Sequence, residues 1–222
     1  MNIQQIILIS PVASFIFLAT LASSLIAFQR HDLASKWMLN PYSLVHHKKY
    51  FQVISSGFIH ADWMHLIFNM LSFYYFALDI DGGIPLEYLM VKSAGPIGHL
   101  YFGLIYFISM ALGDVSTIIK QKDNPKYFSL GASGAITGVV FSFILFAPGS
   151  RLSFFLLPSI PAPFFAILFV VFSVLAGKSR QTNINHDAHL WGGLVGFFLT
   201  VILFPGILQN FLKTIPGLLH FF

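Results

Sequence analysis

Six long apolar segments alternate with polar loops along the chain. They cover residues 6–28, 54–78, 95–112, 133–147, 160–176 and 188–204. Most approach the roughly 20 residues that a helix needs to cross a bilayer. The pattern predicts an all-α membrane protein, a bundle of six transmembrane helices forming a single domain over residues 1–222. We expect the tail, residues 206–222, to lie in the membrane interface.

Composition agrees with this pattern, because 56% of the residues are hydrophobic and only 9% are charged, against about 25% charged in soluble domains. The first segment follows no basic stretch, so we interpret it as a retained span and not as a cleaved signal peptide. A net charge of +4 without a long basic run indicates basic residues flanking the membrane and no nucleic-acid surface. The absence of cysteine excludes disulfides, thiolate metal sites and a cysteine nucleophile.

The fourth segment is unusually short and begins with glycines around a serine, from Gly131 to Gly138. At 1.5 Å per residue it is about 20 Å long, against about 30 Å for a hydrocarbon core. We therefore expect its helix to begin inside the membrane, with Ser133 below the surface. A hydroxyl there needs a partner, and the adjacent glycines let another backbone come close.

A matching pattern occurs in the sixth segment, where His189 precedes another pair of glycines. The two small-residue stripes are Gly134 and Gly138 in the fourth segment and Gly192 and Gly196 in the sixth. Stripes of this kind let membrane helices approach closely, and docking them brings Ser133 near His189. A serine in contact with a histidine forms a nucleophile and its general base.

Attack by a serine on a carbonyl also needs donors for the developing oxyanion. The candidates are His65 and Asn69, which share one helix face, and the backbone N–H of Ser133. The alternative is a purely structural role, in which His65 and Asn69 hydrogen-bond to a neighbouring helix and stabilise the bundle. Asp187 lies two residues from His189 and on another face, so we interpret it as a helix-start residue. The pattern predicts a Ser–His dyad and not a triad.

These residues resemble the rhomboid family of intramembrane serine proteases over about residues 50–205, with 206–222 as a short tail. The family's second core helix is matched by a His, a second His five residues later and an Asn four beyond it. Its nucleophile motif is Gly-x-Ser-Gly, and its last core helix begins Ala-His-x-x-Gly-x-x-x-Gly. The matching residues are His60, His65, Asn69, Gly131, Ser133, Gly134, Ala188, His189, Gly192 and Gly196.

The resemblance implies a role for each of these residues. Ser133 is the nucleophile, His189 the general base and acid, and His65 and Asn69 line the oxyanion hole, while His60 holds the first loop. It also implies cleavage of transmembrane protein substrates within the lipid bilayer, near helix-destabilising residues, without a metal or cofactor. Two positions depart from the family pattern. Phe51-Gln52 replace a common Trp-Arg, and Thr137 replaces a frequent aromatic residue.

Two further expectations concern substrate access. We expect substrates to enter past the fifth segment, whose Pro161, Pro163 and Phe164-Phe165 indicate a mobile helix, and we expect the loop of residues 177–187 to cap the site. The resemblance implies a bacterial cell membrane with the site opening to the extracytoplasmic side. The loops on the site's side nevertheless carry nine of the twelve Lys and Arg residues. The positive-inside rule favours the opposite orientation.

Three rival functions have different signatures. A catalytically inactive rhomboid-like binding or quality-control protein would lack Ser133 or His189, and both are present. A histidine-cluster membrane metal enzyme could use the spacings His60–His65 and His186–His189, but no HExxH motif accompanies them. A transporter would leave the serine and histidine placements without a reason.

Overall fold

The chain is described by a computed structural model that covers residues 2–78, 84–152, 159–177 and 185–218. These residues are mostly helical, with a two-residue antiparallel strand pair, Arg151–Leu152 (β1) and Ile160–Pro161 (β2). The longer helices are α2 (Pro11–Gln29), α6 (Trp63–Phe73), α8 (Ile97–Gly113), α10 (Ser133–Phe146), α11 (Ala162–Gly177), α12 (His186–Leu203) and α13 (Ile207–Leu218). The shorter ones are α1 (Ile3–Ile9), α3 (His31–Trp37), α4 (Pro41–His47), α5 (Gln52–Ser55), α7 (Leu86–Ala94) and α9 (Val115–Gln121).

Three helical stretches of the described chain are long and apolar enough to cross a membrane, namely Pro11–Gln29, Ile97–Gln121 and His186–Leu203. Two shorter apolar helices, Ser133–Phe146 and Ala162–Leu175, accompany them. The prediction of a helical membrane bundle is confirmed, whereas the count of six spans stays a prediction.

Several predicted boundaries were wrong for local reasons. The first apolar segment is two helices, because the chain turns at Ser10 and α2 restarts with Pro11 at its first position. In the second segment the long α-helix begins only at Trp63, after a 3-10 turn (Ser56–Phe58) and an extended Ile59. This segment ends in a π-helical turn, Tyr74–Leu78. The helix α6 begins at Trp63 because the Asp62 side chain accepts the His65 N–H at 2.8 Å.

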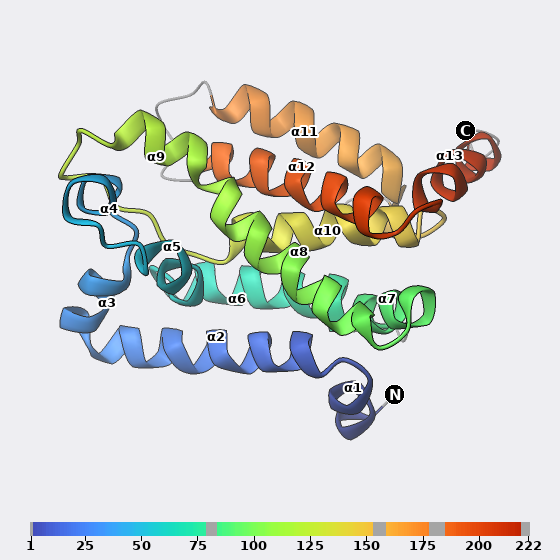
Figure 1. Cartoon of the computed structure of the whole chain (residues 1–222), viewed down its shortest axis with the longest axis horizontal. Helices are drawn as coiled ribbons and strands as arrows, with labels where there is room; N and C mark the ends of the chain where they lie inside the picture. Colours follow the sequence, from blue (N-terminus) through green and yellow to red (C-terminus); the bar gives the residue numbers. More distant parts are fainter. Residues whose placement is uncertain (1, 79–83, 153–158, 178–184, 219–222) are drawn as a thin grey trace.

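The long helices lie roughly alongside one another, and α8 crosses them (Figure 1). Helix α10 packs between α8 and α12 and is buried from Gly134 to Leu145. Its Phe143 meets Phe76, while Phe73 packs edge-on against Tyr106. The short helices α3, α4, α5 and α9 gather at one end of the bundle, and α1, α7 and α13 at the other (Figure 1).

At the end that carries α1 and α7, a buried carboxylate anchors the start of α2. Glu87 of α7 is fully buried and accepts the backbone N–H groups of Val12 at 3.2 Å and Ala13 at 2.7 Å. These N–H groups belong to the first turn of α2 and have no acceptor within their own helix. His99 of α8 completes the cluster, with Nδ1 2.5 Å from Glu87. Glu87 therefore joins three helices at one point.

We expect Glu87→Gln to lower the free energy of unfolding by about 1–3 kcal/mol, because the amide keeps the shape but leaves buried donors poorly satisfied. The measurement is thermal or denaturant unfolding of the purified protein in detergent. Asp32→Asn serves as the matched control, since its pair with Arg30 is exposed and such pairs contribute little. Equal unfolding midpoints for the two variants would contradict the anchoring role of Glu87.

Candidate active site

Ser133 and His189 meet where two helices begin. Ser133 is the first residue of α10, and His189 lies in the first turn of α12, whose N-cap Asn185 accepts the Ala188 N–H at 3.1 Å. The His189 Nε2 is 2.7 Å from the Ser133 Oγ. The two atoms are within hydrogen-bonding distance, so the imidazole can take the proton of the Ser133 hydroxyl.

Glycines bring the two helices close enough for this contact. A Cβ at position 192 would lie 2.8 Å from the carbonyl carbon of Gly134, and one at position 196 would lie 2.6 Å from that of Gly138. Neither position tolerates a side chain unless the backbones move apart. The predicted docking of the two small-residue stripes is confirmed, and it sets the separation of Ser133 from His189.

His65 lies against the segment that leads into Ser133. Gly131 has a φ of +117°, and a Cβ there would lie 2.6 Å from Cε1 of the His65 ring. The Gly131 N–H donates to the Ser56 carbonyl at 2.9 Å, which fixes this approach. Gly131 is thus required both for its backbone conformation and for the space that the imidazole occupies.

Asn69 and His60 lie beside this centre in different ways. The buried Asn69 donates from Nδ2 to the His65 carbonyl at 2.9 Å, one turn back along its own helix, and it is not among the residues that line the cavity described below. His60 is buried, with Nδ1 2.9 Å from the Ser24 Oγ of α2 and its ring 4.9 Å from that of His65. His60 therefore ties the turn before α6 to the first long helix.

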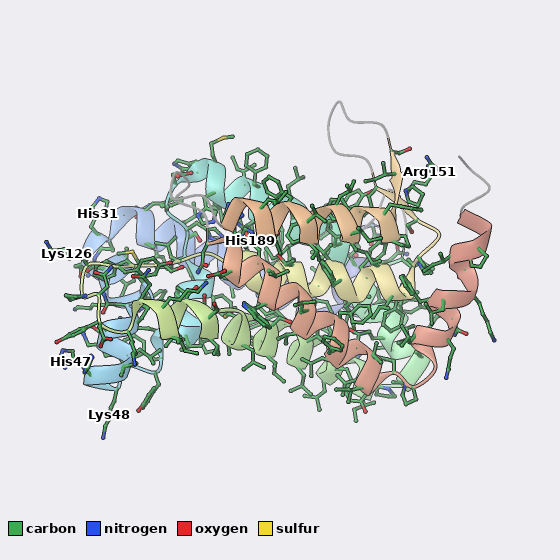
Figure 2. All side chains as sticks on the ribbon, turned by 90° about the horizontal axis from the view of Figure 1, so that it is seen from above. His31, His47, Lys48, Lys126, Arg151 and His189 are labelled. Carbon is green, nitrogen blue, oxygen red and sulfur yellow. The ribbon has the colours of Figure 1, made fainter. Side chains whose placement is uncertain are left out.

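A cavity of about 1030 Å³ opens beside the pair. Ser133, His189, His65 and Gly131 line it, together with residues of α9 and of the segment before α10. His189 lies inward of the labelled surface residues at the same end of the molecule (Figure 2). Tyr127 also lines the cavity, and burial raises the pKa of its phenol. The neutral phenol can therefore donate a hydrogen bond to a group in the cavity.

Of the three positions that depart from the family pattern, Phe51 is exposed, and Gln52 and Thr137 make hydrogen bonds. Gln52 is buried, accepts the Asn40 N–H at 3.3 Å and donates to the Lys36 carbonyl at 3.1 Å, so it links parts of the first loop. The Thr137 hydroxyl donates a hydrogen bond to the Ser133 carbonyl at 2.7 Å, one turn earlier in α10. The aromatic neighbour of His189 is instead Phe169 of α11, with ring centroids 6.5 Å apart and 30° between the planes.

Asp187 is engaged away from the imidazole. Its carboxylate pairs with Lys120 of α9 at 2.5 Å. Asp187 lies in the first turn of α12, as expected of a helix-start residue, and the N-cap itself is Asn185. Asn185 also accepts a hydrogen bond from Thr117 at 3.0 Å. Together these bonds fasten the start of α12 to α9.

The remaining sequence candidates fall into two groups. Pro161 ends the short strand β2, and Pro163 lies in the first turn of α11. Of the loop that was expected to cover the site, residues 178–184 lie outside the described residues. His60 and His65 approach each other, as do His186 and His189. Within the described chain, however, no three His, Cys, Asp or Glu side chains converge as a metal site requires.

Sequence reasoning missed Asn185, Lys120 and Phe169. Asn185 carried a detectable signal, since Asn is a preferred N-cap and lies just before the apolar run. Lys120 and Phe169 carried none, because one is a loop-side lysine among several and the other belongs to a uniformly apolar helix.

Comparison with known proteins gives consistent results. The Rhomboid domain family model matches residues 47–206. The chain is 28% identical over 205 residues to the Bacillus subtilis protein "Putative rhomboid protease YdcA", covering 90% of this chain and 92% of the relative. It is 28% identical to "RHOMBOID-like protein 12, mitochondrial" and 27% identical to "Rhomboid-like protein 16, chloroplastic", both of Arabidopsis thaliana, over 64% and 73% of this chain. The chain spans about half the length of these two plant relatives, 43% and 51%.

Proposed function

The chain belongs to the rhomboid family, and from this premise we propose that it is an intramembrane serine endopeptidase that cleaves transmembrane segments of membrane proteins. The observation that carries the proposal is the 2.7 Å contact between the Ser133 Oγ and the His189 Nε2 at the wall of a large cavity. An inactive relative has no need to keep both groups in hydrogen-bonding contact.

In the proposed reaction, the Ser133 Oγ attacks the scissile carbonyl carbon while His189 Nε2 takes the hydroxyl proton. The carbonyl oxygen becomes an oxyanion near the N-terminus of α10, where the backbone N–H of Ser133 has no acceptor within the helix. The positive end of the α10 dipole favours the same charge. We propose His65, held against Gly131, as a second donor, and Asn69 as a third once its side chain leaves the His65 carbonyl.

The tetrahedral intermediate then collapses. His189 gives its proton to the leaving amine, the C–N bond breaks, and Ser133 carries the acyl group. Water attacks this ester with His189 again as general base, which releases the new carboxyl end and restores the hydroxyl. No step calls for a metal or cofactor.

For substrate access we propose lateral entry between α6 and α11. Met64 of α6 is 59% exposed and lines the cavity, so this part of the wall is open to the apolar surroundings. Helix α11 packs on α12 and α10, and its outer side chains Ile167, Val171 and Leu175 are exposed. A substrate helix entering here reaches Ser133 after local unwinding, which small or helix-breaking residues facilitate.

The test of the proposed function is labelling by a fluorophosphonate probe, paired with cleavage of a reporter that contains one transmembrane helix with small residues at its centre. Purified wild-type protein in liposomes should label and cleave, and Ser133→Ala should do neither. Cleavage that survives in Ser133→Ala would overturn the proposal. Absence of both activities in folded wild-type protein would favour the inactive binding relative.

We further propose that the protein resides in a bacterial cell membrane with the active-site end on the extracytoplasmic side, as in the family resemblance. Lys48 and Lys126 lie at the end of the molecule that carries His189, and Arg151 lies toward the other end (Figure 2). This distribution opposes the proposed orientation under the positive-inside rule. Orientation is therefore the part of the proposal that most needs a direct measurement.

Since the chain has no cysteine, single cysteines report orientation without background. In the proposed orientation, a membrane-impermeant maleimide added to intact cells labels Lys122→Cys but not Lys92→Cys, and both label after the membrane is permeabilised. The reverse pattern in intact cells would show that the charge distribution determines the orientation.

A further inference from the structure

The imidazole of His186 is buried beside the catalytic pair, and the proposed mechanism does not use it. The residue is 5% exposed, it lines the same cavity as Ser133 and His189, and neither ring nitrogen makes a hydrogen bond with any described group. A buried polar group without a partner destabilises a fold, so its presence calls for an explanation in function.

Within the described part of the chain, the His189 side chain hydrogen-bonds to Ser133 alone, so its Nδ1 has no acceptor there. For Nε2 to accept the Ser133 proton, the neutral ring must carry its proton on Nδ1. In serine proteases with a triad, a carboxylate accepts this Nδ1–H and thereby selects the tautomer. Here Asp187 is engaged with Lys120 and Ser116, and among the described residues no carboxylate bonds to His189.

His186 lies where such an acceptor is required. It precedes His189 by three residues on α12, so the two rings share one helix face. Their centroids are 6.0 Å apart with 76° between the planes. Direct ring-to-ring hydrogen bonding needs centroids within about 5 Å, whereas one intervening water, with two bonds of about 2.8 Å, spans the observed separation.

Aromatic residues of α11 hold both rings in this relation. The Phe172 ring lies 5.7 Å from His186, edge to face, and the Phe169 ring lies 6.5 Å from His189. Each imidazole of α12 therefore packs against a phenylalanine of α11. The phenylalanine restricts rotation of the imidazole ring without competing for its hydrogen bonds.

We propose that His186 is a positioning residue that accepts, through one water molecule, the Nδ1–H of His189 and so holds the tautomer in which Nε2 faces Ser133. An imidazole then takes the orienting role that a carboxylate has in a triad. This inference rests on the proposed protease function.

The experiment compares His186→Leu, which removes the acceptor, with His186→Asn, whose side-chain oxygen retains one. The readouts are the rate of fluorophosphonate labelling, kcat and KM for the transmembrane reporter, and the unfolding midpoint. His186→Leu should lower the labelling rate and kcat by about 10- to 100-fold, the scale of loss when the hydrogen-bond partner that orients a metal-bound histidine is removed. KM should stay constant, and the unfolding midpoint should change little, because a single water-mediated hydrogen bond contributes little net stability. His186→Asn should keep kcat within about threefold of wild type.

His47, an exposed histidine at the end of α4, provides the matched control through His47→Leu, which should leave every readout unchanged. Wild-type kcat in His186→Leu would overturn the proposal. Equal losses in the Leu and Asn variants would also overturn it, since they would indicate packing and not hydrogen bonding. Failure of the protease function itself is distinguishable, because the wild type would then neither label nor cleave.

Discussion

Replacing His189 with alanine should reduce both fluorophosphonate labelling and reporter cleavage by about 10⁴-fold or more, the scale of loss when a serine nucleophile loses its base. The structure indicates why the loss is so large. Among the described residues, the Ser133 Oγ makes its side-chain hydrogen bond to the His189 Nε2 alone, so no other described group is in place to take the proton. Cleavage kinetics over a wide range of enzyme concentration provide the measurement.

The double variant Ser133→Ala/His189→Ala separates a dyad from two independent contributions. Groups that act as a unit lose their effect together, so the double variant should be no less active than either single one. The fold should persist, because one hydrogen bond contributes about 1 kcal/mol to stability. Substantial labelling of His189→Ala would identify a different base, and additive losses would argue against a shared proton transfer.

The meeting of Ser133 and His189 was predictable because its cause is local and repeated. In each helix the member of the pair precedes two glycines four positions apart, a pattern that favours close approach of membrane helices. Once α10 and α12 dock through Gly134, Gly138, Gly192 and Gly196, the two ends have little freedom. The sequence alone was therefore sufficient for the pair.

Other features depend on contacts between residues far apart in the chain. Glu87 meets Ala13 across 74 positions, and Phe169 reaches His189 from a helix without a polar landmark. The direction of the Asn69 amide, toward the His65 carbonyl, depends on a rotamer choice that the four-residue spacing leaves open. The break at Ser10 was missed for a different reason. Hydropathy is uniformly high across it, so the hydrophobic pattern does not show that one helix ends there and α2 begins with Pro11.

The close contact between Gly192 and Gly134 leads to the second prediction with a large expected effect. Gly192→Val should reduce reporter cleavage by about 100-fold, since displacement of reacting groups by about 1 Å has effects of that size. Any Cβ at this position overlaps the backbone of Gly134, which directly follows Ser133, while His189 lies one turn before Gly192 on the same helix. Separating the helices therefore moves both members of the pair. Stability should also fall, by about 2–3 kcal/mol, as in other overpacked cores.

Gly149→Ala is the matched control, because a Cβ there meets nothing within 4 Å, and it should leave cleavage and unfolding unchanged. Graded substitution adds a sharper criterion. Gly192→Ala should lie between wild type and Gly192→Val in both cleavage and stability, because the displacement grows with the volume that must fit between α10 and α12. If Gly192→Val kept wild-type cleavage while unfolding at a lower temperature, the helix separation would matter for stability alone. The register of Ser133 with His189 would then have to be maintained by the bonds that fasten the start of α12 to α9, where Asn185 meets Thr117 and Asp187 meets Lys120.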